Sequence, residues 1–150
     1  MTYGNPWQSY RQVATRTASP GALVLMLYDG AIRFLNQALQ GFEREDPLEF
    51  HQLVNNNLLR AQEIINELNL SLNMAEGGEF AQRMRGLYTY FDSRLQQSNA
   101  HKKPDGIHDV LQRLTIVRDA WAEMQARQGD AAPSSTGTQP SPSVSLEAQG

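Results

Sequence analysis

The chain has 150 residues, enough for one domain with a hydrophobic core, and no cysteine, which excludes disulfides and thiolate chemistry. Its 13 Lys and Arg against 16 Asp and Glu give a formal net charge of −3, so no overall basic field favours nucleic acid. The first residues lack the basic and apolar regions of a signal peptide, and the longest apolar run, residues 22–28, is too short to span a bilayer. We therefore expect a cytoplasmic helical domain without membrane insertion.

Residues 1–18 are polar and turn-prone, yet they carry large aromatic side chains. Trp7, Tyr10 and Ala14 follow an i, i+3, i+7 spacing, which places them on one face if the segment is helical. Two interpretations remain open. The rings either pack permanently on the domain, as large aromatics often do, or form a detachable flap over an apolar groove.

The first long helix is predicted from about Pro20 to Phe42. The Ser19 hydroxyl can accept a hydrogen bond from a backbone N–H group at the helix start, and Pro20 suits the first helical position. The polar side chains fall on one narrow stripe: Asp29, Arg33, Asn36 and Gln40. Nearly all others are apolar, whereas an ordinary surface helix needs an apolar arc of about 100°. This helix is therefore expected either at the centre of a bundle or covered on a second face.

The second helix is predicted to begin at Asp46-Pro47, which repeats the pattern of a capping residue followed by proline. Its apolar side chains form a heptad-like seam: Phe50, Val54, Leu58, Ala61, Ile65, Leu68 and Leu72. Leu53 and Ile64 lie beside this seam. Asn55, Asn56 and Asn57 are interpreted as an exposed or inter-helix polar turn, because Asn has a weak helix propensity.

Two further helices are predicted, from about Glu79 to Asn99 and from about Ile107 to Arg127. The third helix carries one apolar stripe: Phe80, Met84, Leu87, Phe91 and Leu95. The fourth carries another: Ile107, Val110, Leu114, Val117, Trp121 and Met124. Trp121 is therefore expected to face the interior. Trp121→Ala should then lower the free energy of unfolding by about 3–5 kcal/mol.

The predicted fold is an all-α, antiparallel, up-down-up-down four-helix bundle, because long helices joined by short loops pack as antiparallel neighbours. We expect a cap segment over residues 1–18 and the bundle over residues 19–128. After Gly129 the composition shifts to Pro, Ser, Thr and Gly. Residues 129–150 are predicted to be a disordered tail that the fold does not need.

No pattern predicts catalysis or a cofactor. The paired Glu-x-x-His motifs of di-iron bundles are absent, and His101 and His108 lack the further ligands that zinc requires. No phosphate-binding glycine loop, nucleophile elbow or Ser/His/Asp arrangement is present. We therefore expect neither an enzyme nor a metal site.

Several short stretches, in collinear order over residues 7–124, resemble the flagellar export chaperone family FliS. They are Tyr10, residues 17–20, residues 23–31, Ala38, residues 61–68, Leu72-Asn73, residues 77–79, residues 87–90, Leu95, Asn99, Leu114 and residues 118–121. The resemblance implies a helical bundle that holds the C-terminal segment of flagellin in a non-assembling state. It also implies delivery of that segment to the flagellar type III export gate.

The family's functional residues transfer as follows. Trp7 and Tyr10 would form the cap that covers apolar surface when no client is bound. The client groove would be lined by Leu53, Leu58, Ile64, Ile65, Leu68, Tyr88 and Leu95.

A second hypothesis stays open at this point, a homo-oligomeric helical scaffold or an adaptor for a folded partner. The aromatic N-terminal segment favours the chaperone, since a permanent oligomer needs no flap. The chaperone is expected to be a monomer or a weak homodimer.

Overall fold

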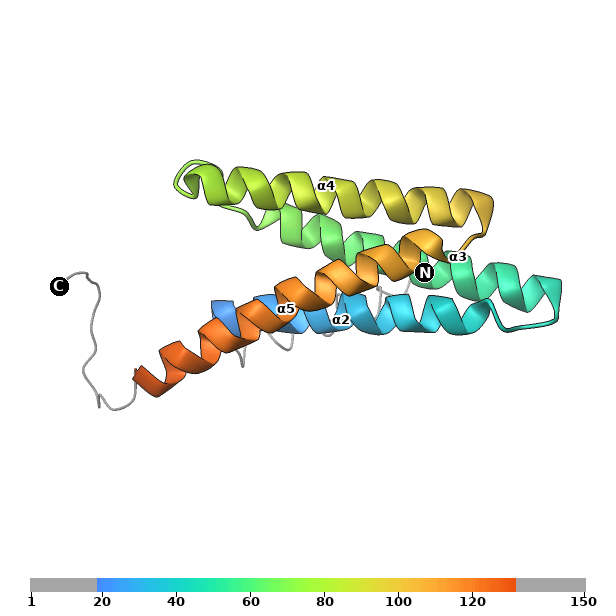
Figure 1. Cartoon of the computed structure of the whole chain (residues 1–150), viewed down its shortest axis with the longest axis horizontal. Helices are drawn as coiled ribbons and strands as arrows, with labels where there is room; N and C mark the ends of the chain where they lie inside the picture. Colours follow the sequence, from blue (N-terminus) through green and yellow to red (C-terminus); the bar gives the residue numbers. More distant parts are fainter. Residues whose placement is uncertain (1–18, 132–150) are drawn as a thin grey trace, which may run out of the picture. The chain divides into compact units, whose positions relative to one another are not determined.

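The computed structural model describes residues 19–131 as four long helices and short connections. The helices are α2 (Pro20–Gly41), α3 (Pro47–Leu70), α4 (Gly78–His101) and α5 (Asp105–Ala131), and no strand occurs in this range (Figure 1). The predicted all-α fold is confirmed. Helix α5 continues four residues beyond the predicted end, to Ala131.

The first two helices begin where the sequence places their caps. The Ser19 hydroxyl accepts a hydrogen bond from the Ala22 backbone nitrogen at 3.2 Å, and the Asp46 carboxylate accepts one from the Glu49 nitrogen at 3.0 Å. Each cap is followed by proline at the start of the helix. These bonds satisfy backbone donors that a helix start otherwise leaves without a partner.

Adjacent helices run antiparallel, as the residues that face each other show. A Cβ atom added at Gly30 of α2 would lie 3.2 Å from Ile64 of α3, and one added at Gly41 would lie 3.1 Å from Val54. The residue numbers thus rise along α2 as they fall along α3. Glycine lets these two helices approach closely, which buries the α3 side chains against α2.

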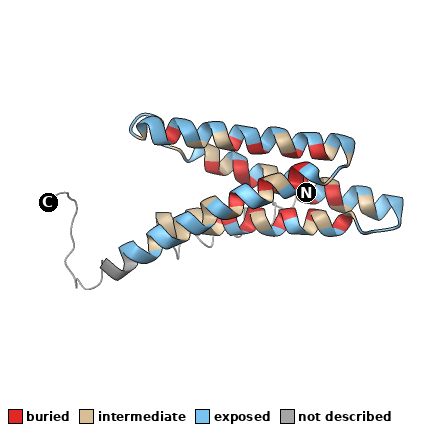
Figure 2. Ribbon diagram, viewed as in Figure 1, coloured by how far each residue is buried: buried red, intermediate tan, exposed pale blue. Residues whose placement is uncertain are grey.

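The buried core draws on all four helices, and Figure 2 marks these residues in red. The largest fully buried side chains are Leu35, Val54, Leu58, Ile64, Ile65, Leu68, Phe91, Leu95, Ile107, Val110 and Leu114.

The chain separates into two compact units, with the boundary between Arg118 and Asp119 inside α5. The first unit holds α2, α3, α4 and residues 105–118. The described part of the second unit is the continuation of α5. The predicted boundaries at residues 18 and 128 stay predictions.

The apolar stripe of α5 is fully buried only over its first part. Val117 is half-buried in the first unit, whereas in the second Trp121 is half-buried and Met124 is exposed. The expected interior position is therefore wrong for Met124 and only partly met by Trp121. In the described part of the second unit α5 is a single helix, and no other described element of that unit covers its stripe.

Candidate functional site

Of the seven residues predicted to line the client groove, six are core residues of the first unit. None of the six is more than 3% exposed: Leu58, Ile64, Ile65, Leu68, Tyr88 and Leu95. Leu53 is half-buried and faces Gly41 of α2. A partner can touch Leu53 in this conformation. Of the other six, Ile65 and Tyr88 form the floor of the surface pocket described below, whereas the remaining four could be reached only after neighbouring helices separate. The groove assignment stays a prediction.

Other large apolar side chains are exposed instead. In the first unit they are Leu48, Leu59, Leu70, Phe80, Tyr90 and Ile116. Leu70 is 69% exposed and Phe80 is 62% exposed, and the two residues lie on either side of the α3–α4 connection. In α2, all residues from 21 to 26 are half-buried. Solvent-exposed apolar surface therefore lies at the first turns of α2 and around the α3–α4 connection.

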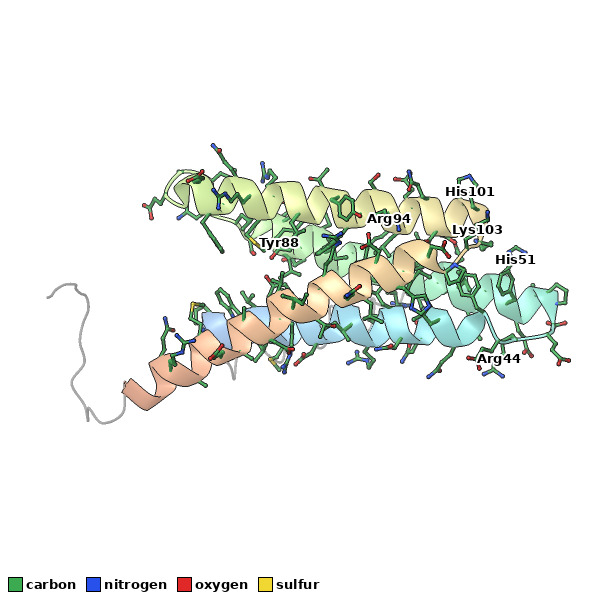
Figure 3. All side chains as sticks on the ribbon, viewed as in Figure 1. Arg44, His51, Tyr88, Arg94, His101 and Lys103 are labelled. Carbon is green, nitrogen blue, oxygen red and sulfur yellow. The ribbon has the colours of Figure 1, made fainter. Side chains whose placement is uncertain are left out.

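A pair of tyrosines joins α2 to α4 inside the bundle. The hydroxyl oxygens of Tyr28 and Tyr88 lie 2.6 Å apart and share a hydrogen bond, and both side chains are buried. Burial raises the pKa of both phenols above the ordinary value of 10.0. Figure 3 labels Tyr88 on α4. The pair stays neutral at physiological pH and connects two helices that are not consecutive in the sequence.

Three side-chain hydrogen bonds link α3 to α4 at intervals of seven residues, and we call these contacts the α3–α4 ladder. The Asn99 amide donates to Asn55 at 2.9 Å, the Gln62 amide donates to Asp92 at 3.0 Å, and Arg85 Nε donates to Asn69 at 3.2 Å. Each step of seven up α3 matches a step of seven down α4, as in an antiparallel coiled coil. The ladder fixes the register of the two helices.

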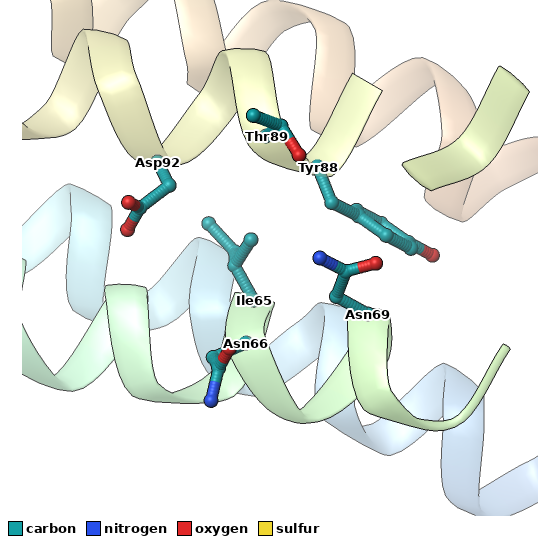
Figure 4. Close-up of a pocket in the computed structure, with 6 residues that line it drawn as sticks. All are labelled: Ile65, Asn66, Asn69, Tyr88, Thr89 and Asp92. Carbon is teal, nitrogen blue, oxygen red and sulfur yellow. The ribbon is translucent and has the colours of Figure 1, made fainter. Parts of the chain in front are cut away.

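A surface cavity of about 180 Å³ opens beside the ladder, and we call it the ladder pocket. Its lining residues are Ile65, Asn66, Asn69, Tyr88, Thr89 and Asp92 (Figure 4). Two of them, Ile65 and Tyr88, belong to the predicted groove. They are buried and form an apolar floor, while the other four are polar. The pocket therefore combines an apolar floor with a hydrogen-bonding rim.

A charged cluster fastens α4 to the first part of α5. Asp109 accepts hydrogen bonds from Arg94 Nε at 3.1 Å, from Arg113 Nε at 2.7 Å and from the Tyr90 hydroxyl. The Arg113 guanidinium lies 5.5 Å from the centre of the Tyr90 ring. The hydrogen bonds from Tyr90 and Arg113 hold the pKa of Asp109 at about 2, below its ordinary value of 3.8. Asp109 is therefore an anion at any physiological pH.

The remaining predictions concern the cap, the tail, metal binding and membrane insertion. Trp7 and Tyr10 of the cap, and the tail beyond residue 131, are outside the described range. Within residues 19–131, no group of three or more His, Cys, Asp or Glu side chains is placed to hold a metal ion. None of the helices in that range is both long and apolar enough to cross a membrane.

The family model described as "Flagellar protein FliS" matches residues 3–128 of the chain. The chain belongs to the FliS family. Several FliS relatives carry the name flagellar secretion chaperone, including the following three. The protein of Bacillus subtilis (strain 168) is 37% identical over 82% of this chain and 88% of its own length. That of Salmonella typhimurium is 32% identical over 80% of this chain and 90% of its own length. That of Campylobacter jejuni is 30% identical over 79% of this chain and 89% of its own length.

Membership of FliS identifies the protein as a flagellar export chaperone, a class that is non-enzymatic in general. The match spans nearly all of the described residues and most of the N-terminal segment. The predicted resemblance to FliS is thus confirmed.

Sequence reasoning missed the ladder and the Asp109 cluster. The heptad spacing of Asn55, Gln62 and Asn69 was a readable signal for the ladder. By contrast, the Asp109 cluster joins residues of two helices, so it has no signature within either helix.

Proposed function

We propose that the protein acts in the cytoplasm, where it binds the C-terminal segment of flagellin and prevents its premature polymerisation. It then assists delivery of flagellin to the flagellar export gate. The observation that carries this proposal is FliS membership over residues 3–128, with relatives named flagellar secretion chaperones. A chaperone for a polymerising subunit must cover the surface through which that subunit assembles.

The exposed apolar side chains around the α3–α4 connection, Leu70 and Phe80, support this proposal. Soluble proteins seldom expose large apolar patches, and amphipathic partner helices bind such surfaces. Leu53, partly accessible beside Gly41, gives the client one point of entry to the proposed groove. The four buried groove residues outside the ladder pocket would contact the client once helices separate, and Trp7 and Tyr10 would cover apolar surface in the free protein.

Light scattering after gel filtration, with and without a flagellin C-terminal peptide, tests the proposal. A monomer or weak dimer should become a stoichiometric complex with the peptide. In a parallel assay, substoichiometric flagellin should fail to polymerise when the protein is in excess. A stable homo-oligomer that neither binds the peptide nor prevents flagellin polymerisation would contradict the proposal and favour the oligomeric scaffold.

Two leucines of α3 provide a matched comparison for the groove. Leu53→Ala should weaken peptide binding, because Leu53 is a partly accessible groove residue. Leu48→Ala should leave it unchanged, because Leu48 is exposed on the same helix outside the proposed groove. Equal affinities of the two variants, measured by calorimetry, would remove Leu53 from the client site.

A further inference from the structure

The ladder pocket holds polar groups that the fold itself does not use. Asp92 accepts the Gln62 amide through Oδ1, and in the described part of the chain no hydrogen bond is made to its Oδ2. Among the same residues, the Thr89 hydroxyl has no hydrogen-bond partner. Figure 4 shows both side chains on the α4 side of the pocket. The pocket thus offers a carboxylate oxygen and a hydroxyl to a ligand.

The orientation of Asn69 follows from its neighbour on the ladder. Arg85 carries only donors, so the atom that it contacts at 3.2 Å must be the amide oxygen of Asn69. The Asn69 amide nitrogen is therefore turned to the opposite side, toward Ile65 in Figure 4. It offers a donor where Thr89 and Asp92 offer acceptors.

The floor of the pocket differs in character from this rim. Ile65 and the Tyr88 ring are buried and present apolar surface, which suits the methylene groups of a ligand rather than its charge. The pocket accordingly fits a group with an apolar stem, a cationic donor at its end and a carbonyl near its base.

From this geometry we propose that the ladder pocket binds an arginine side chain of a protein partner. The stem lies on Ile65 and the Tyr88 ring, and the guanidinium donates to Asp92 Oδ2 and Thr89. The Asn69 amide donates to a main-chain carbonyl of the partner. Arginine fits better than lysine, because its planar group presents five donors that can reach two acceptors at once. The inference is independent of whether flagellin is that partner.

The probe is N-acetyl-arginine amide, titrated into the full-length isotope-labelled protein and followed by NMR. We expect weak, saturable shifts of the Ile65 methyl groups, the Thr89 amide and the Asn69 side-chain amide. N-acetyl-citrulline amide has the same shape without the charge and should bind more weakly. N-acetyl-citrulline amide binding as tightly as the arginine amide would overturn the proposal.

Three variants locate the binding. Asp92→Asn should reduce the affinity by roughly threefold, the effect of losing one exposed ion pair. Thr89→Leu should abolish the shifts, because the larger side chain fills an exposed pocket without disturbing the core. Glu79→Gln, at the far end of α4 outside the pocket, should bind like the parent. Circular dichroism melts establish that each variant is folded, and undiminished binding by folded Thr89→Leu would refute the site.

Discussion

Tyr28 and Tyr88 place two phenol hydroxyls in contact inside the core, where a polar group without a partner is costly. One hydrogen bond uses one of the two hydroxyl hydrogens. The pair therefore gives each hydroxyl a partner in the core and connects α2 to α4.

A double-mutant cycle on this pair should be strongly non-additive. Tyr88→Phe leaves the Tyr28 hydroxyl buried alone and should lower the free energy of unfolding by about 1–3 kcal/mol. Tyr28→Phe together with Tyr88→Phe should cost less than the sum of the single changes, because both hydroxyls are removed. Urea unfolding measures all four proteins. Additive losses would mean that the hydroxyls do not act as a pair.

Asp109 gives the second prediction for a single residue. Its pKa is lowered in the folded protein, so its stabilising effect is fully present above pH 3.8 and is lost as the pH falls toward about 2. Asp109→Asn should lower the free energy of unfolding at neutral pH by about 1 kcal/mol, the upper range for partly exposed ion pairs. The variant should also lose less stability than the parent between pH 4 and pH 2.

Glu79→Gln is the control for Asp109. Glu79 pairs with Arg83 one turn away at 3.0 Å, and both side chains are largely exposed. The free energy of unfolding of the Glu79→Gln variant should therefore differ from that of the parent by no more than about 0.5 kcal/mol. If both variants lose equal stability, the cluster on Asp109 has no special role in holding α5.

At the scale of elements, the crossing of α4 and α5 depends on a glycine. A Cβ atom added at Gly106 would lie 2.7 Å from the Arg94 carbonyl oxygen and would also clash with the Ser98 hydroxyl. The carbonyl belongs to the helix backbone and cannot rotate away. The close approach of the two helices therefore requires glycine at this position.

Two glycine-to-alanine changes should act in opposite directions. Gly106→Ala should lower the free energy of unfolding by about 1–3 kcal/mol, because the helices must move apart. Gly86→Ala in α4 meets nothing within 4 Å and should raise it by about 0.5–1 kcal/mol, since alanine favours the helix. Thermal melts monitored by circular dichroism compare the two, and a stabilised Gly106→Ala variant would contradict this packing.

For the molecule as a whole, the prediction that remains from the sequence concerns the N-terminal cap. If Trp7 and Tyr10 compete with the client for apolar surface, Trp7 should become more accessible when a flagellin peptide binds. Competition also lowers the apparent affinity by the fraction of molecules that are open. Deleting residues 1–16 should then tighten the complex or speed its formation.

Acrylamide quenching of a Trp121→Phe variant reports on Trp7 by itself, because the chain contains two tryptophans. Phe replaces Trp121 in this variant because Trp121 is half-buried, and another aromatic ring keeps most of its packing. Unchanged quenching together with unchanged binding after the deletion would make the N-terminal aromatics ordinary packing residues.

Local signals in the sequence were sufficient to predict the helices and the family. Ser19-Pro20 and Asp46-Pro47 are local signals, so the starts of α2 and α3 could be predicted to the residue. The ordered short stretches identified FliS for the same reason, since each can be read without knowing its neighbours in space.

Which apolar residues are core and which are surface depends on how the helices pack, and the sequence does not show this. Ile64 and Leu70 are both apolar residues of α3, yet Ile64 is buried against Gly30 whereas Leu70 is exposed where the helix ends. Burial depends on the partner that each face meets, and helical periodicity gives the face without the partner. The Asp109 cluster and the ladder pocket likewise arise between helices, from residues that come together only when those helices pack.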